Sequence, residues 1–131
     1  MRLVDTSAWV EFLRRKGEAK VKEAVARLLE TEQAAYTCPI RFELLSGVRP
    51  GEEPDLDQLF KFSRRLSFEP EDWAQAAALE REFRARGLTI PRNDLFVATV
   101  AIRVEVPVVC RDAHFEAMRN ILGTRLQVEQ V

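Results

Sequence analysis

Histidine and cysteine are scarce in this 131-residue chain, which has one of the first and two of the second. Zinc sites and disulfide frameworks need several such residues, so the sequence argues against both. We expect Cys38 and Cys110 to be small buried side chains in a protein of the reducing cytoplasm. No segment approaches the roughly 18 apolar residues that span a bilayer. Asp5 and Glu11 interrupt the amino terminus before a signal peptide could develop, so we expect neither membrane insertion nor export.

An excess of charge of either sign is also absent, because 20 basic and 21 acidic residues leave a net charge of -1. This balance argues against a protein that wraps nucleic acid by bulk positive charge, so any such contact must come from local groups of basic residues. All but four of the basic residues are arginines, and the planar guanidinium suits phosphate. The length predicts one compact domain, residues 1–131, that buries about two-thirds of its unfolded surface.

Short apolar segments alternate with amphipathic ones along the chain. Short apolar strands separated by helices predict a parallel sheet of four to five strands covered on both faces, which is a three-layer α/β/α fold. A loop without regular structure is expected at 48–55. The expected strands are 2–5, 34–38, 65–69, 106–110 and 125–130, and the expected helices are 6–15, 18–32, 40–47, 70–87, 93–104 and 111–123.

Acidic residues stand where expected strands end or helices begin. Asp5 follows the first strand, Asp112 follows the strand at 106–110, and Asp94 opens a helix. Ligands of such sheets bind beyond the carboxyl ends of the strands, where the strand order reverses, so we expect these acids at one edge. Each aspartate alone is also explained as a helix N-cap, and that alternative stays open. Glu43 lies within the apolar stretch FELL, where it is either solvated between apolar neighbours or, as the better explanation, buried beside a cation.

Four segments together resemble, in order and approximate spacing, the motifs of PIN-domain ribonucleases, and most of all the VapC-type toxins of prokaryotic toxin–antitoxin pairs. The resemblance covers essentially the whole chain and implies a PIN-like fold and a metal-dependent endoribonuclease with four acids. The segments are LVDTSAW (3–9), IRFELLSGV (40–48), NDLFVATVA (93–101) and VVCRDAHF (108–115). The metal-binding and catalytic acids that it implies are Asp5, Glu43, Asp94 and Asp112, and the hydroxyl pair Thr6 and Ser7 would support a ligand or a water near the metal.

Two positions depart from the family's motifs. Cys110 stands where relatives usually carry threonine or serine, which puts a hydroxyl contribution from this position in doubt. His114, the chain's only histidine, stands where many relatives have an acid. It could contact the metal's surroundings or a phosphate, or it could be an ordinary surface or capping residue, and we favour the second interpretation.

The chemistry of four acids agrees with what the resemblance implies. Carboxylates about 5 Å apart repel by roughly 3 kcal/mol per pair at an effective dielectric constant near 20, so a cluster requires protons or a cation. Ligands that are all oxygen favour Mg²⁺ or Mn²⁺. Such ions promote attack by water on a phosphodiester, which would leave a 5′-phosphate and a 3′-hydroxyl. Arg41, Arg92 and Arg111 accompany the acids in sequence. They are either surface partners of acids or, as the sharper hypothesis, contacts that hold RNA phosphates.

The resemblance also implies partners. VapC-type toxins form homodimers and bind a small antitoxin that covers an apolar groove, so we expect a homodimer and a VapB-like antitoxin. The segment 44–62 carries more apolar residues than a small helical excursion needs, and core packing is expected to account for most of them. An alternative is a non-catalytic PIN-like module that only binds RNA or protein. A phosphate-accepting receiver or a phosphatase with an aspartyl nucleophile is disfavoured, because both normally need a late lysine and the last lysine here is Lys61.

Overall fold

Five short strands form one parallel sheet in the computed structural model, which describes residues 1–131. The strand order is β3-β2-β1-β4-β5, and every neighbouring pair is parallel. The predicted parallel sheet of four to five strands is therefore confirmed. The strands are β1 (Arg2–Val4), β2 (Ala34–Tyr36), β3 (Arg64–Arg65), β4 (Val108–Cys110) and β5 (Val128–Gln130).

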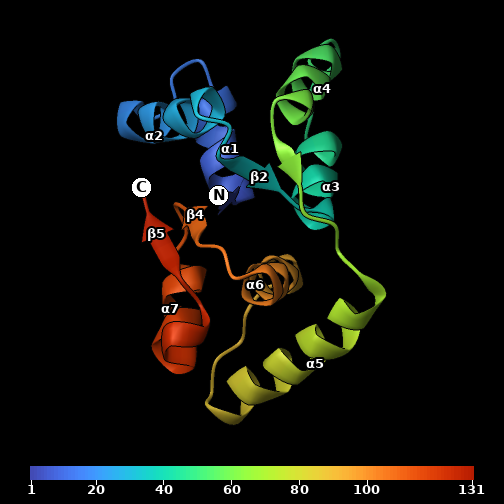
Figure 1. Ribbon diagram of the computed structural model, residues 1–131, viewed down its shortest axis with the longest axis vertical. Helices are drawn as coiled ribbons and strands as arrows, with labels where there is room; N and C mark the ends of the chain where they lie inside the picture. Colours follow the sequence, from blue (N-terminus) through green and yellow to red (C-terminus); the bar gives the residue numbers. More distant parts are fainter.

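Seven α-helices cover the sheet. Helices α1 and α2 pack on one face, α6 and α7 pack on the other, and α5 lies outside α6 (Figure 1). This arrangement confirms the expected three layers. The helices are α1 (Thr6–Leu13), α2 (Ala19–Glu30), α3 (Cys38–Ser46), α4 (Glu53–Lys61), α5 (Pro70–Ala85), α6 (Arg92–Val104) and α7 (Ala113–Leu122), and a 3-10 turn (Gly123–Arg125) follows.

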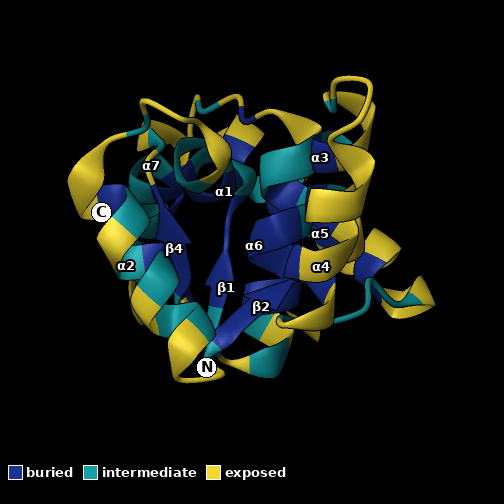
Figure 2. Ribbon diagram, turned by 90° about the horizontal axis from the view of Figure 1, so that it is seen from above, coloured by how far each residue is buried: buried dark blue, intermediate teal, exposed yellow.

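The core lies between these layers. A single cluster of 28 buried residues includes the sheet and the inner faces of the helices. Strands β1, β2 and β4 are almost entirely buried in Figure 2, and the exposed residues lie on the outer faces of the helices and on the loops. Because both faces of these strands are covered, they read in the sequence as continuous apolar runs rather than as alternating ones. No helix has both the length and the apolar character needed to cross a lipid bilayer.

One helix was not among those expected, and another begins earlier than expected. Helix α4 begins at Glu53, within the segment 48–55 that was expected to be a loop, so that expectation is wrong for its last three residues. Acidic residues and a proline fill its first turn, where both favour a helix start. Helix α3 begins at Cys38 rather than at residue 40, because its proline is also in the first turn. Cys38 is consequently exposed, and the expectation that both cysteines are buried is wrong for this one.

The strand at 65–69 is shorter than expected. Only Arg64 and Arg65 pair with β2, and both are exposed at the edge of the sheet. Leu66 still donates its backbone N–H to the carbonyl of Tyr36 at 2.8 Å, and Leu66 and Phe68 pack against the core. The sequence therefore indicates the right segment but overestimates the extent of the pairing.

The order of the strands reverses at β1. Strands β1, β2 and β3 extend in one direction across the sheet, and β4 and β5 extend in the other. The carboxyl ends of β1 and β4 consequently flank the switch point, which is where parallel sheets bind ligands. Asp5 follows β1 directly, and Asp112 lies two residues beyond β4.

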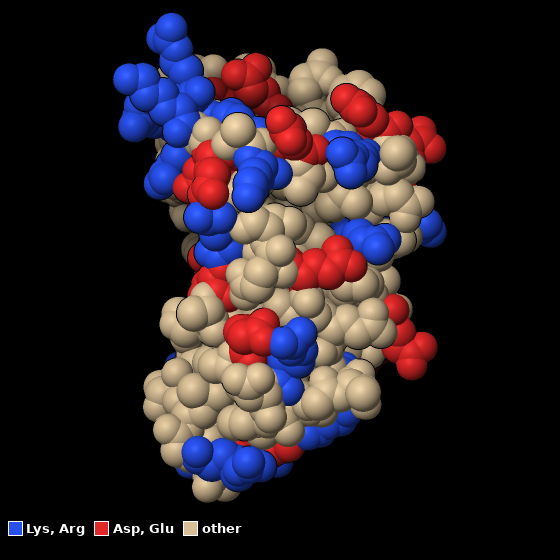
Figure 3. Space-filling model, turned by 90° about the vertical axis from the view of Figure 1, so that its left-hand side faces the viewer, with Lys and Arg blue, Asp and Glu red and all other residues tan.

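The surface has no dominant charge. Acidic and basic side chains are interspersed over the face in Figure 3, and basic ones gather at its upper left corner. The net charge of -1 agrees with this mixture. A phosphate backbone would therefore have to be held by local groups of basic residues.

Candidate active site

Asp5 is buried at the end of β1, and only one of its carboxylate oxygens has a partner. Oδ2 accepts hydrogen bonds from the backbone N–H of Ser7 at 3.0 Å and from its hydroxyl at 2.7 Å, so Asp5 does cap α1. Oδ1 is buried without any hydrogen bond, and the residue is 2% exposed. Burial raises the pKa of Asp5, the bonds from Ser7 oppose this rise, and Glu43 and Asp112 add to it. An unpaired buried carboxylate oxygen is costly, and a bound cation would offset this cost.

Ser7 joins the two turns that flank the switch point. Besides donating to Asp5, its hydroxyl accepts the backbone N–H of Arg111 at 3.0 Å. Asp112 follows in the chain and caps α7, because its Oδ1 accepts the backbone N–H of His114 at 2.8 Å. Gln130 of β5 donates to the carbonyl of Asp112 at 2.8 Å. The turn that carries Asp112 is thus held from the start of α1 and from β5.

Asp94 enters the site from the first turn of α6 and does not cap its helix, which begins after Pro91. The capping alternative therefore holds for Asp5 and Asp112 but fails for Asp94. Burial raises the pKa of Asp94 to about 6; Asp5 and Asp112 also raise it, and a hydrogen bond with His114 opposes them. The pKa of this carboxyl is thus unusually high for an aspartate.

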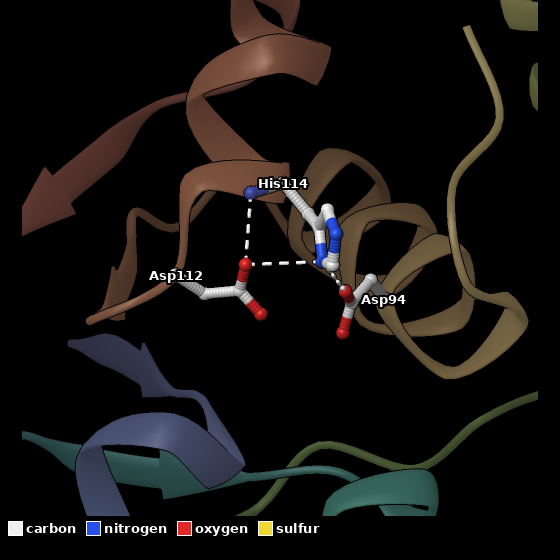
Figure 4. Close-up of side chains that lie close together, drawn as sticks. All are labelled: Asp94, Asp112 and His114. Atoms are coloured by element: carbon white, nitrogen blue, oxygen red, sulfur yellow. Dashed lines mark hydrogen bonds and ion pairs between the residues drawn. The ribbon is translucent and has the colours of Figure 1, made fainter.

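His114 lies between two of the acids, and its side chain is 46% exposed, so it is a surface residue that also contacts the candidate site. Its Nδ1 is 2.8 Å from Oδ2 of Asp94 and 3.0 Å from Oδ1 of Asp112 (Figure 4). The sequence could not predict this contact, because the direction of a side chain depends on tertiary packing. Its only signal is that His114 follows Asp112 by two residues, in the first turn of a helix.

Glu43 is placed at the margin of the site by α3. Its Oε1 accepts a hydrogen bond from the hydroxyl of Thr6 at 2.8 Å, and no lysine or arginine pairs with it. The residue is half-buried, and its neighbours Phe42 and Leu45 are exposed. Glu43 is therefore neither fully buried nor paired with a cationic side chain, so the expectation of burial beside a cation is wrong for the lysines and arginines of this protein. Its charge nevertheless raises the pKa of Asp5.

The acids converge from four elements of the fold, although not all equally closely. One ligand atom each from Asp94, Asp112 and His114 lies within 4.8 Å of the others. Asp5 and Glu43 are outside this group, but Asp5 interacts electrostatically with Asp94, Asp112 and Glu43. Carboxylate oxygens, one of them buried and unpaired, fit a hard divalent cation.

Cys110 precedes this turn on β4 and is buried. Burial, together with the charge of Asp5, raises the pKa of its thiol to about 12. The group is therefore a neutral thiol at physiological pH in the metal-free protein.

The three arginines of the phosphate prediction have partners within the protein. Arg92 pairs with Glu80 at 3.6 Å, and Arg111 pairs with Glu18. The guanidinium of Arg41 lies 5.3 Å from the centroid of an aromatic ring of α4. These contacts occur at exposed arginines and would compete with a phosphate, and the phosphate role of the three residues stays a prediction.

Comparisons with known proteins agree with this architecture. The model of the PIN domain family matches residues 2–121. Ribonuclease VapC11 of Mycobacterium tuberculosis is 38% identical over 132 residues, which cover 97% of this chain and 96% of the relative. Ribonuclease VapC19 of the same organism is 32% identical over 118 residues, which cover 88% and 92%.

Solved structures with lower identity have the same fold. VapBC2 of Rickettsia felis, bound to a DNA fragment from its promoter, aligns with a TM-score of 0.80 and 20% identity over 99% of this chain and 98% of that one. FitAcB of Neisseria gonorrhoeae aligns with a TM-score of 0.76 and 20% identity over 98% and 96%.

Proposed function

Because this chain belongs to the PIN domain family, we propose that it is an endoribonuclease that hydrolyses RNA phosphodiester bonds and is the toxin of a toxin–antitoxin pair. Relatives at 38% identity are named as ribonucleases. The observation that carries the proposal is the convergence of Asp94 and Asp112 with Asp5, whose buried Oδ1 has no partner. The proposal treats residues 1–131 as one PIN-like domain in the cytoplasm; the single core cluster and the two free cysteines support this.

The acids would hold Mg²⁺ or Mn²⁺. Asp5, Asp94 and Asp112 are the proposed ligands, and Glu43 acts with them at the margin. A divalent ion held by these acids would neutralise charge on the phosphate and make water a better nucleophile at neutral pH. Hydrolysis by in-line attack of water leaves a 5′-phosphate and a 3′-hydroxyl.

The protein's own contribution is to fix the acids before the substrate arrives. Ser7 holds Oδ2 of Asp5 with two hydrogen bonds, and Thr6 holds Oε1 of Glu43 with one. Both hydroxyls belong to the first turn of α1, so one element sets the relative placement of the two carboxylates. Groups fixed in this way need little reorganisation when the reaction occurs.

Sequencing of RNA ends tests the reaction. Total RNA is incubated with Mn²⁺ and either wild type, Asp5→Asn or the control Asp57→Asn, which neutralises an exposed acid of α4. We expect wild type and the control to produce discrete new 5′-phosphate ends, and Asp5→Asn to produce at least about 100-fold fewer, because one metal ligand is lost. Full cleavage by Asp5→Asn, or no cleavage by a folded wild type that binds the ion, would contradict the proposal and favour a non-catalytic binding module.

An antitoxin like VapB is the proposed partner. Similar solved structures are VapBC complexes, some of them bound to DNA. A groove of about 660 Å³ lies between α1, α3 and α4, and Glu43 is among its lining residues, so an occupant of the groove would reach the site. Its apolar lining residues are Val10, Leu13, Leu44, Val48 and Leu56.

Co-expression with the product of a neighbouring open reading frame tests this partner. We expect the two chains to purify together and RNA cleavage to be suppressed in the complex. Leu13→Asp puts a charge on the rim of the groove, and we expect it to weaken the complex by about tenfold or more. Unchanged affinity of this variant would show that the partner binds elsewhere.

A further inference from the structure

The two ring nitrogens of His114 have different surroundings. Nδ1 faces the carboxylates of Asp94 and Asp112, at 2.8 Å and 3.0 Å (Figure 4). Nε2 has no partner within the protein, and the side chain is 46% exposed. Only Nδ1 therefore belongs to the candidate site, and the rest of the ring borders solvent.

The start of α7 fixes this orientation. His114 is the second residue of the helix, and its backbone N–H donates to Oδ1 of Asp112 at 2.8 Å. The same oxygen faces Nδ1 at 3.0 Å. The cap that begins the helix therefore also sets the spacing between the ring and the carboxylate.

The separations of these atoms fit ligands of one ion. Ligands at right angles on an octahedral ion with bonds of about 2.1 Å are about 3 Å apart. Nδ1 has this separation from an oxygen of Asp94 and from an oxygen of Asp112, and one atom from each of the three residues lies within 4.8 Å of the others. Asp5 supplies an independent observation, because its buried Oδ1 has no partner and its charge acts on both aspartates.

Resting on the proposed metal-dependent function, we propose that Nδ1 of His114 is a ligand of the divalent ion and makes the centre favour first-row transition ions such as Co²⁺ over Mg²⁺. Mg²⁺ takes oxygen ligands almost exclusively, whereas imidazole binds Co²⁺ and its neighbours in the first transition row well. A ligand nitrogen must present a lone pair, so the ring hydrogen is then on Nε2, the nitrogen that borders solvent. His114 is thus a residue that selects the metal.

Titration calorimetry with the purified full chain tests this selectivity. We expect His114→Asn to weaken Co²⁺ binding by about 10- to 100-fold and Mg²⁺ binding by less than about threefold. If His114 only steadies the two carboxylates through hydrogen bonds, all ions weaken by the same factor, and the proposal is overturned. Equal affinities of wild type and His114→Asn for Co²⁺ overturn it as well.

A second measurement uses wild type and so does not depend on the folding of a variant. His114 is the only histidine, so the imidazole ¹⁵N signals need no assignment to a residue. We expect diamagnetic Zn²⁺ to shift the Nδ1 signal to that of a metal-bound nitrogen, with the hydrogen on Nε2, and Mg²⁺ to leave it largely in place. An Nδ1 signal unmoved by Zn²⁺ bound at the site overturns the proposal. RNA cleavage with Mg²⁺ that depends on Asp5 would still stand, so the two proposals fail separately.

Discussion

At the scale of single residues, the candidate site makes the metal-free protein less stable. Asp5 and Asp94 are both held in surroundings that oppose their ionisation, mainly because they are buried and partly because each faces other acids. The pKa of Asp94 is raised from 3.8 to about 6 in the folded chain. Between about pH 4 and 6 the folded protein therefore holds a proton that the unfolded chain has lost. The free energy of unfolding falls as the pH rises through this range, and the full cost is present at pH 7.

Replacing Asp94 by asparagine removes this cost. In a buffer with chelator, we expect Asp94→Asn to raise the free energy of unfolding at pH 7.5 by on the order of 1 kcal/mol, after allowance for the partly exposed position of the group. At pH 4 the gain should be close to zero. Thermal unfolding followed by calorimetry at both pH values measures the difference, with Asp57→Asn as the control at an exposed acid. A gain of equal size at both pH values would contradict this account.

Some features of this site could be predicted from the sequence, and others could not. Asp5 and Asp112 could be placed at one edge because each follows a strand of a parallel sheet, and the carboxyl ends of such strands share an edge. The ring of His114 could not be placed, because its direction depends on the rotamer that the packing of α6 against α7 allows. Nor could the sequence indicate that Thr6 and Ser7 hold two different acids, since neighbouring residues of a helix point in directions about 100° apart.

At the scale of elements, a buried ion pair holds α6 in place. Asp72 of α5 is fully buried, and Arg103 of α6 donates to its two carboxylate oxygens at 2.9 Å and 3.1 Å. Arg103 also donates to the carbonyl of Ser67 at 2.8 Å, and the backbone N–H of Glu69 donates to Asp72 at 2.8 Å. This network fixes the start of α5 against the end of the helix whose first turn carries the acid Asp94.

Breaking the pair on one side should be costly. We expect Arg103→Met to lower the free energy of unfolding by about 3–5 kcal/mol, because it leaves Asp72 buried without its counter-charge. Adding Asp72→Asn should recover part of the loss, since the amide is neutral. Urea unfolding measures both. Arg86→Met at the exposed end of α5 is the control, with an expected change within about 0.5 kcal/mol. A loss in Arg103→Met no larger than that of the control would contradict the role of the pair.

The boundaries of elements are less predictable from sequence than their existence. Each strand expected from an apolar run is present, yet β3 has only two residues because its partner β2 is itself short. Helix α4 begins before its apolar pattern does, because acidic residues and Pro54 stabilise a first turn that carries no apolar signal. Strand pairing and helix capping decide where these elements begin and end. Both depend on neighbouring residues that the hydrophobic periodicity of the sequence does not describe.

At the scale of the whole molecule, the layers follow from the alternation of strands and helices, whereas surfaces for partners do not. One such surface is an aromatic cluster of Phe68, Trp73 and Phe96, whose ring centroids are 4.8 to 5.3 Å apart. Trp73 is 60% exposed. The sequence could not show that these three aromatic side chains meet at the surface rather than pack in the core, because they come from a loop and two different helices. Exposed aromatic groups of this kind are typical of interfaces between proteins.

The expected homodimer gives this cluster a testable role. If two copies meet through it, Trp73→Ser should raise the dimer dissociation constant by about 30-fold or more, since a central tryptophan commonly contributes 2 kcal/mol or more. Light scattering during size-exclusion chromatography over a range of concentrations measures the change. Phe62→Ser is the matched control, because Phe62 is equally exposed, at 69%, but follows α4 and belongs to no aromatic cluster. A dimer weakened by the control and not by Trp73→Ser would place the interface on the α4 side, and a monomeric wild type would exclude the dimer.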